Sequence, residues 1–199
     1  MAVSTRDVDS IDPPGGLLPT LALSATLLAA GTLPAMAAEP TAAATPDVVA
    51  AAPGFTPLIN YHSGKCLDVP GGSTRDGVQV QQWTCNGKAH QRWNLRYART
   101  ALGLKLYYVV NEKSGKCLSV KGNSKKNGTP IIQWPCKEGD TAEFFAPLKV
   151  NDVPGTNFVL WGAHSGKYPQ VDGGSQANGA KVSLWEGKSG RHHYYWRFG

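Results

Sequence analysis

The sequence predicts an all-β fold, a small closed barrel built from three similar repeats. The 199-residue chain holds 23 Gly and 14 Pro but only two Met, a composition typical of short strands and turns. No segment shows convincing helical periodicity of apolar residues over three turns. A set of sequence markers also recurs three times at one interval, which is the signature of a repeat architecture.

The first 37 residues have the layout of a secretory signal peptide. An apolar run over residues 17–30 precedes Ala35-Met36-Ala37, a small-x-small cleavage pattern. The run is too short to span a bilayer comfortably, so no membrane insertion is expected. Three aspartates accompany Arg6 ahead of the run, where a basic region is usual, and a disordered leader is the alternative. We predict that residues 1–37 direct secretion and are removed.

Residues 38–57 are rich in Ala, Pro and Thr, which predicts an extended linker. Residues 58–199 remain for folding, a length that suits one domain. All four cysteines lie within this range, which is consistent with an oxidising, extracellular location.

The repeats are defined by four markers that return every 51 residues. Short β-favouring runs separate these markers within each unit. A solenoid would need more copies and distinct capping units, so three copies most simply close around a pseudo-threefold axis. The markers are Ser-Gly-Lys at 63–65, 114–116 and 165–167, Gly71, Gly122 and Gly173, Gly77, Gly128 and Gly179, and Trp83, Trp134 and Trp185.

Three motifs of the first repeat carry a family resemblance. Cys-Leu-Asp-Val at 66–69, the Val-Gln-Gln-Trp-Thr-Cys run at 80–85 and Gln-Arg-Trp at 91–93 resemble the ricin B-chain-type lectin repeat and its Q-x-W signature. The resemblance extends over residues 58–199. It implies a β-trefoil that binds carbohydrate, with Trp93 as a core aromatic.

The cysteine pattern favours two disulfides, Cys66–Cys85 and Cys117–Cys136. Each pair is 19 residues apart, and both cysteines are replaced together in the third repeat, by Tyr168 and Gly187. Pairing within each repeat is therefore favoured over the other two connectivities that four cysteines allow.

Strand alternation indicates where a sugar site would lie. In residues 78–83, Gln79, Gln81 and Trp83 share one face while the valines share the other. An exposed indole can cover the apolar C–H face of a sugar while neighbouring polar groups bind its hydroxyls. The alternative is a tryptophan that merely packs beneath a loop.

The resemblance implies one complete site, in the first repeat. Asp68 would accept hydrogen bonds from two sugar hydroxyls, Gln81 would add a polar contact and Trp83 would stack on the ring. His90 and Gln91 stand at the family's Asn-Gln pair. The histidine departs from the family pattern and would make affinity depend on pH.

The second and third repeats depart further from the pattern. Ser119 and Gln170 replace the carboxylate of Asp68, which removes the strongest acceptor. Trp134 and Trp185 remain, and we expect at most weak secondary contacts from them. A purely structural role for both repeats is the alternative.

Catalysis, metal binding and cofactor binding are not expected. The sequence holds no G-x-S-x-G, H-E-x-x-H or Gly-rich phosphate motif, and His192-His193 has no partners at ligand spacing. Residues 38–199 carry 19 basic and 11 acidic side chains, a net charge of +8. The basic residues form no single stripe, so anionic glycans or a bacterial wall are better partners than nucleic acid.

We therefore predict a secreted, non-enzymatic lectin that recognises sugars of the galactose, arabinose or xylose type within polysaccharide, mainly through the first repeat. The composition of the leader and linker looks bacterial. The oligomeric state stays open, with a monomer expected. The alternatives are a trefoil protease inhibitor, which would act through one exposed loop, and a non-catalytic targeting or toxin subunit that works with a partner chain.

Overall fold

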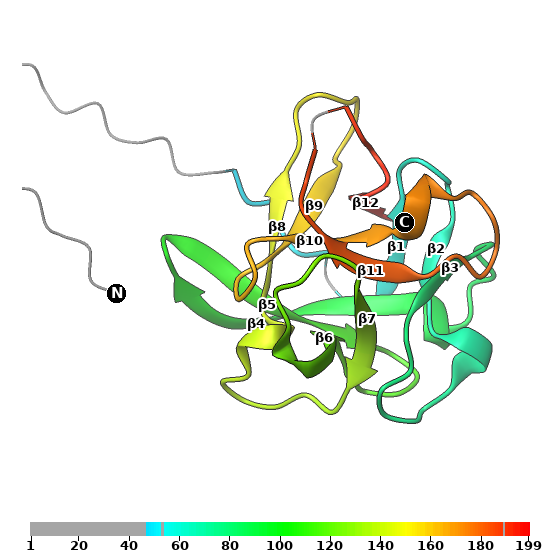
Figure 1. Ribbon diagram of the computed structural model, residues 1–199, viewed down its shortest axis with the longest axis horizontal. Helices are drawn as coiled ribbons and strands as arrows, with labels where there is room; N and C mark the ends of the chain where they lie inside the picture. The colour runs from blue at the N-terminus through cyan, green and yellow to red at the C-terminus, as the bar shows by residue number, and fades with distance from the viewer. Residues whose placement is uncertain (1–46, 53, 189) are drawn as a thin grey trace, which may run out of the picture. The chain divides into compact units, whose positions relative to one another are not determined.

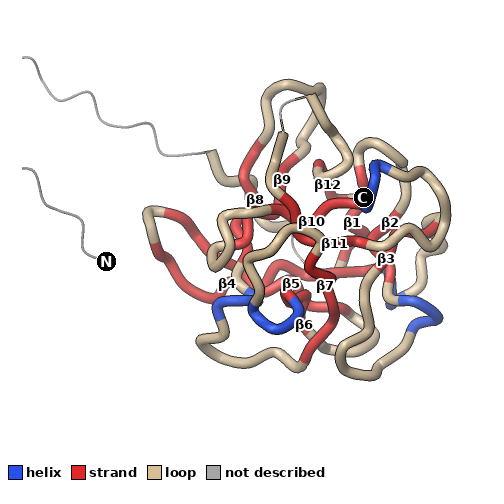
Figure 2. Tube along the Cα trace, viewed as in Figure 1, coloured by secondary structure: helices blue, strands red, loops and turns tan. Residues whose placement is uncertain are grey.

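A computed structural model describes residues 47–52, 54–188 and 190–199, which contain twelve strands and five single-turn 3-10 helices (Figures 1 and 2). The predicted signal peptide and residues 38–46 of the predicted linker lie outside this part. The strands are β1 (Thr56–Asn60), β2 (Cys66–Asp68), β3 (Gln81–Trp83), β4 (Arg92–Ala101), β5 (Leu104–Asn111), β6 (Cys117–Val120), β7 (Thr129–Trp134), β8 (Phe145–Lys149), β9 (Phe158–Gly162), β10 (Tyr168–Val171), β11 (Val182–Trp185) and β12 (Tyr195–Phe198). The 3-10 helices are η1 (Pro70–Gly72), η2 (Ala89–Gln91), η3 (Lys121–Asn123), η4 (Thr141–Glu143) and η5 (Asp172–Gly174).

Six strands close into a barrel, which removes the exposed sheet edges that an open sheet would have. Antiparallel pairing runs from β1 to β4, β5, β8, β9 and β12, and β12 returns to β1. The other six strands form three hairpins, β2–β3, β6–β7 and β10–β11. The predicted all-β fold of three repeats, a β-trefoil, is confirmed.

Hydrogen bonds between hairpins follow the interval of 51 residues. A glycine N–H of each hairpin donates to a carbonyl of the next one, at 2.8–3.0 Å. Each glycine has a positive φ of 74–83°, and a Cβ there would lie 3.6–3.7 Å from the tryptophan ring of the neighbouring hairpin. The positive φ favours glycine at these positions, and the tryptophan ring lies at ordinary van der Waals distance from where a Cβ would be. The three bonds join Gly77 to Gln133, Gly128 to Leu184 and Gly179 to Gln82.

One large aromatic side chain from each repeat is fully buried in the core. Trp93, Phe145 and Trp196 are 0% exposed and stand at corresponding positions of the three repeats. The indole N–H of Trp93 donates to the Leu67 carbonyl at 2.9 Å, so this ring is satisfied inside the barrel. The Q-x-W aromatic of the first repeat is thus a packing residue, as predicted.

Both predicted disulfides are present, Cys66–Cys85 and Cys117–Cys136. In the third repeat a packing contact takes the place of the bridge. The Tyr168 ring lies so close to Gly187 that a Cβ there would be 2.7 Å away, and it stacks on Tyr194 with centroids 5.5 Å apart.

Part of the predicted linker belongs to the folded part. Val48 pairs with Leu148 of β8, the Val49 N–H donates to the Pro147 carbonyl at 2.9 Å, and Val49 and Ala51 pack against the core. Strand β8 meets β5 at a single residue pair, so its remaining backbone groups on that side are available to this segment. Strand β1 also begins two residues before the predicted boundary at 58. Within the described ranges, no helix is long and apolar enough to cross a membrane.

Glu143 is a buried carboxyl group in the second repeat, at the position that Gln91 holds in the first. Its Oε2 accepts the Lys137 backbone N–H at 3.0 Å, while Oε1 has no hydrogen-bond partner among the described residues. Burial raises the pKa of this carboxyl to about 7. At Gln91, by contrast, the corresponding atom is an amide nitrogen that donates to Asp68 and to the Thr84 carbonyl.

We predict that Glu143→Gln stabilises the domain at neutral and alkaline pH. From pH 4.5 to about 7 the unfolded chain loses the Glu143 proton while the folded chain keeps it, so the parent's free energy of unfolding falls across this window. The variant should lack this loss and exceed the parent by about 2–3 kcal/mol above pH 7. Urea unfolding of both proteins from pH 4.5 to 8.5 measures the difference.

The matched control is Glu138→Gln, because Glu138 is an exposed carboxylate of the same loop. It should leave the pH dependence unchanged. A stability difference between parent and Glu143→Gln that stays constant with pH would contradict the raised pKa.

Candidate functional site

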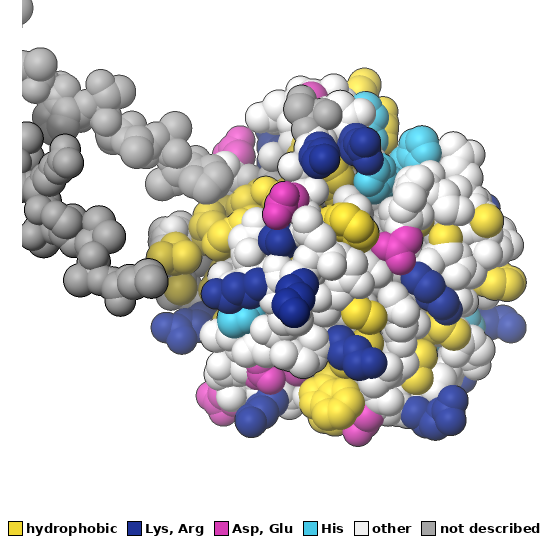
Figure 3. Space-filling view, viewed as in Figure 1, with side chains coloured by type: hydrophobic (Ala, Val, Ile, Leu, Met, Phe, Trp, Pro, Cys, Tyr) yellow, Lys and Arg dark blue, Asp and Glu magenta, His cyan; other side chains and the backbone are white. Residues whose placement is uncertain are grey.

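The first repeat forms an open pocket of about 360 Å³. Its walls come from β2, from β3 and from the segment that leads into η2. The space-filling view shows that the molecular surface carries scattered basic side chains and a few exposed apolar ones (Figure 3). The lining residues are Asp68, Gly71, Gln81, Trp83, Asn86, Lys88 and His90.

The Asp68 carboxylate lies at the floor of this pocket and is 3% exposed. Asp68 and Gln81 face each other across the β2–β3 pairing, and Gln81 Nε2 donates to Oδ2 at 2.9 Å. On the other oxygen, Oδ1 accepts from Gln91 Nε2 at 3.1 Å and lies 3.3 Å from His90 Nε2. Two amide donors, one from β3 and one from η2, therefore fix the orientation of the carboxylate.

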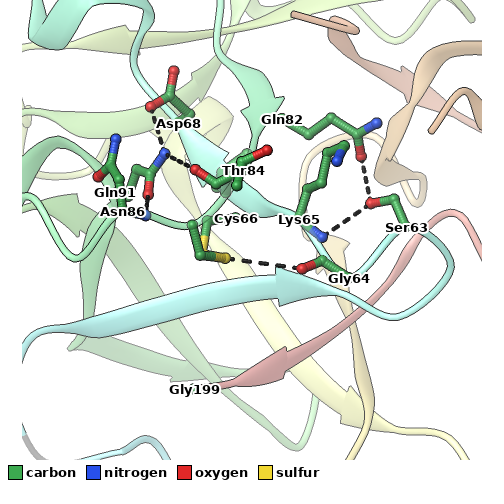
Figure 4. The surroundings of a disulfide bond; sticks show 12 residues. Ser63, Gly64, Lys65, Cys66, Asp68, Gln82, Thr84, Asn86, Gln91 and Gly199 are labelled. Carbon is green, nitrogen blue, oxygen red and sulfur yellow. Dashed lines mark hydrogen bonds between the residues drawn. A yellow bond between two sulfur atoms is a disulfide. The ribbon is translucent and has the colours of Figure 1, made fainter. Parts of the chain in front are cut away.

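Gln91 lies behind the carboxylate and does not line the pocket. It is 1% exposed, its Oε1 accepts the Asn86 N–H at 2.8 Å, and its Nε2 also donates to the Thr84 carbonyl at 3.1 Å (Figure 4). Each polar atom of its side chain thus has a protein partner in this structure. A direct contact of Gln91 with a ligand stays a prediction.

The Cys66–Cys85 disulfide ties β2 to the loop that follows β3 (Figure 4). Trp83 stands opposite Cys66 in the strand register and is 42% exposed, so it is not packed beneath a loop. The bridge thus holds an exposed indole on the strand next to a buried carboxylate, as the spacing of the two motifs predicts.

The third repeat completes the first-repeat site. Lys181 Nζ donates to Gln81 Oε1 at 3.2 Å, and Gly179 lies against the Trp83 ring. The Asn178 side chain accepts the Thr84 N–H at 2.9 Å. The sequence analysis assigned none of these residues to the site. The recurrence of glycine at positions 77, 128 and 179 did indicate that this position is structurally constrained.

The corresponding pocket of the second repeat is larger, about 460 Å³, and has lost the polar pair of the first. Ser119 and Ile132 stand in place of Asp68 and Gln81, beside Trp134, which is 44% exposed. The one carboxylate among the lining residues is that of Asp140, which accepts the Ala142 N–H at 3.0 Å and so caps η4.

The third repeat also has an exposed tryptophan, and its carboxylate comes from a different position, Asp172. Trp185 is 37% exposed, and Gln170 replaces Asp68. Asp172 lies two residues further on, where its Oδ2 accepts from Ser183 Oγ at 3.0 Å and its Oδ1 from Trp185 Nε1 at 3.4 Å. This carboxylate is therefore engaged by its own repeat.

In the part of the chain that the structure describes, no group of three or more His, Cys, Asp or Glu side chains is placed to hold a metal ion.

A closed six-stranded barrel with three capping hairpins, each presenting an exposed tryptophan, defines a β-trefoil of the lectin type. The chain belongs to the ricin-type beta-trefoil lectin domain-like family, whose model matches residues 49–134 and again residues 100–185. The second match is displaced from the first by one repeat. Carbohydrate binding is the function that this family suggests.

Relatives with known names cover parts of the chain. Nigrin b of Sambucus nigra is 30% identical over 82 residues, 41% of this chain and 12% of that protein. The probable lipoprotein EnvE of Salmonella typhimurium is 26% identical over 80 residues, 40% of this chain and 41% of that protein. The chain therefore spans less than half the length of either relative.

Solved structures match over most of the described domain. The designed threefold-symmetric protein ThreeFoil is 31% identical with a TM-score of 0.64, covering 72% of this chain and 96% of that one. The exo-beta-1,3-galactanase of Clostridium thermocellum is 29% identical with a TM-score of 0.66, covering 74% and 30%. The agglutinin of Rhizoctonia solani, 21% identical with a TM-score of 0.61, covers 77% and 98% and shows the shared fold.

We predict that Gln91→Ala destabilises the domain by about 2–3 kcal/mol, because it strands the Asn86 N–H and the Thr84 carbonyl and removes one donor to Asp68. Gln176→Ala is the matched control, since this amide is exposed and its Nε2 lies 3.4 Å from His62 Nε2, and the change should cost less than about 0.5 kcal/mol. Urea unfolding at pH 7 compares the two variants. If both variants lost the same free energy of unfolding, the hydrogen bonds of the buried Gln91 amide would not stabilise the domain.

Proposed function

We propose that this protein is a lectin whose first-repeat pocket binds a sugar of the galactose, arabinose or xylose type within a polysaccharide. The observation that carries the proposal is the pre-oriented carboxylate of Asp68 beside the exposed indole of Trp83. The carboxylate supplies a charge-assisted acceptor for hydroxyl groups. The indole supplies an apolar surface for the C–H face of the sugar ring.

The hydrogen bonds that Asp68 already makes indicate which of its acceptor positions are open to a sugar hydroxyl. A carboxylate offers about four acceptor positions. Gln81 donates to one oxygen and Gln91 to the other, and His90 Nε2 lies 3.3 Å from Oδ1. Oδ2 therefore retains room for one sugar hydroxyl. The His90 contact, at 3.3 Å, is the longest of the three and the one most readily exchanged for a second hydroxyl.

The relationship to the galactanase supports the choice of sugar class. That enzyme acts on β-1,3-linked galactose, as its name states, and this chain aligns with 30% of its length. Galactose, arabinose and xylose all present a ring that can stack on Trp83 while neighbouring hydroxyls reach Asp68. Trp134 and Trp185 would add weak contacts to further units of a polymer.

The proposed role is binding without catalysis. Among the residues that line the first-repeat pocket, Asp68 is the single carboxylate, whereas glycoside hydrolysis ordinarily needs two that flank one bond. The two disulfides fit the proposed secretion.

We predict that Asp68→Asn and Trp83→Ala each weaken binding of a short galacto-oligosaccharide, arabino-oligosaccharide or xylo-oligosaccharide at least tenfold. The first change removes the charged acceptor while it keeps the shape of the side chain, and the second removes the stacking surface. Isothermal titration calorimetry with the three oligosaccharide series measures the effect. Trp185→Ala is the matched control and should stay within twofold of the parent, because its indole belongs to the third repeat.

Two other outcomes would overturn this proposal. A loss caused by Trp134→Ala or Trp185→Ala, but not by Trp83→Ala, would move the site out of the first repeat. Absence of binding to all three oligosaccharides and to their polymers would leave the fold intact but reject this sugar class, and protease inhibition would become the function to assay.

A further inference from the structure

A separate pocket of about 340 Å³ lies at the junction of the third repeat with the β1–β2 turn. Figure 3 shows histidine and basic side chains gathered at the top of the view, over β9 and β12. No acidic side chain is among the described residues that line this pocket. The lining includes His62, Arg191, His192 and His193, and part of the wall is the bare backbone of Gly173 and Gly174.

We propose that this pocket binds the anionic group of an acidic saccharide, a carboxylate or a sulfate. The pocket is distinct from the first-repeat site, since the two share no lining residue. The inference rests on the proposed lectin function only in taking the anion to be part of a glycan.

His193 occupies in the third repeat the position that His90 occupies in the first. A Cβ on Gly72 would lie 3.1 Å from His90 Nδ1, and a Cβ on Gly174 would lie 3.2 Å from His193 Nδ1. Both rings therefore pack in the same way against a glycine of the preceding 3-10 turn. The backbone around these two histidines therefore has the same arrangement, which we call the backbone frame, and the two sites differ in their side chains.

The difference that matters is the carboxylate. His90 Nε2 faces Asp68 Oδ1 at 3.3 Å, whereas Gln170 stands at the corresponding place near His193 and brings no charge. Within the described part of the chain, the His193 ring makes neither an ion pair nor a hydrogen bond. A protonated His193 thus lacks the counter-charge that its equivalent has in the first repeat.

The surroundings of His193 are cationic instead. Burial lowers the pKa of His193, and the positive charges of Arg191, His62 and His192 lower it further. His62 faces the pocket from the β1–β2 turn, with Gln176 3.4 Å from its Nε2. A bound anion would offset this mutual repulsion.

Two carboxylates belong to elements that pack near this cluster, but neither of them lines the pocket. The rings of Tyr61 and Tyr195 lie 5.7 and 5.2 Å from that of His192. Asp152 accepts a hydrogen bond from the Tyr195 hydroxyl at 2.6 Å, and Asp172 accepts hydrogen bonds from Ser183 and Trp185. No described residue in the pocket wall is acidic, so an anionic ligand would place a compensating charge directly beside the histidines and Arg191.

The proposal predicts binding that tightens as pH falls. An anion stabilises the protonated form of each histidine, so complex formation takes up protons and the affinity rises as the histidines become charged. The probes are sodium glucuronate and sodium sulfate, with glucose as the neutral control, all at one ionic strength. Histidine ring signals in 1H–13C NMR spectra of the full chain report the site.

The expected result is a saturable shift of the His62, His192 and His193 signals, with a dissociation constant at least fivefold lower at pH 5.5 than at pH 8. Glucose should leave these signals in place. Arg191→Gln should weaken glucuronate binding at least fivefold. Lys125→Gln, an exposed change of equal charge in the second repeat, should stay within twofold.

Signal shifts that grow linearly without saturation would indicate general charge screening and overturn the proposal. The same holds if Lys125→Gln weakens glucuronate binding as much as Arg191→Gln does. Affinity that does not change with pH would overturn it as well. Trp83→Ala separates the two sites, since it should abolish neutral-sugar binding while the glucuronate shifts persist. Loss of the glucuronate shifts in that variant would place the anion in the first repeat.

Discussion

The hydrogen bonds between neighbouring hairpins are the constraint on which the rest of this structure depends. Each repeat is too small to bury its own apolar face, so the three hairpins must be held together in a cycle. The glycine that donates each bond also lies against the tryptophan of the next hairpin. The same contact, made three times, therefore joins neighbouring hairpins and supports the exposed tryptophan rings.

The same arrangement explains why the first-repeat site is assembled from two repeats. Its carboxylate and indole come from β2 and β3, but Gly179 and Lys181 of the third repeat support them. Burying a carboxylate costs free energy unless hydrogen-bond donors reach its oxygens. The amide of Gln91 meets this need at Asp68, while Glu143 holds the same place in the second repeat with one oxygen unpartnered among the described residues.

The features that recur in each repeat could be predicted from the sequence. The interval of 51 residues predicts the barrel, and the paired loss of both cysteines in the third repeat predicts the disulfides, which the structure contains. It also places Asp68 and Trp83 on neighbouring strands. Contacts across the pseudo-threefold axis, such as that of Lys181, escaped prediction because they join residues 100 positions apart. The burial of Gln91 and the docking of Val48 depend on packing that composition does not reveal.

One backbone frame thus carries three different chemical environments. The first repeat presents a carboxylate beside an indole, the second replaces that polar pair with Ser119 and Ile132, and the third surrounds His193 with positive charge. The strands and turns that hold these side chains are the same, so divergence required changes at a few positions only. Because each frame is anchored to its neighbour by backbone hydrogen bonds, a side chain in a pocket can change without loss of the fold. Under the two proposals made above, this scaffold separates the recognition of neutral and charged parts of one glycan between its repeats.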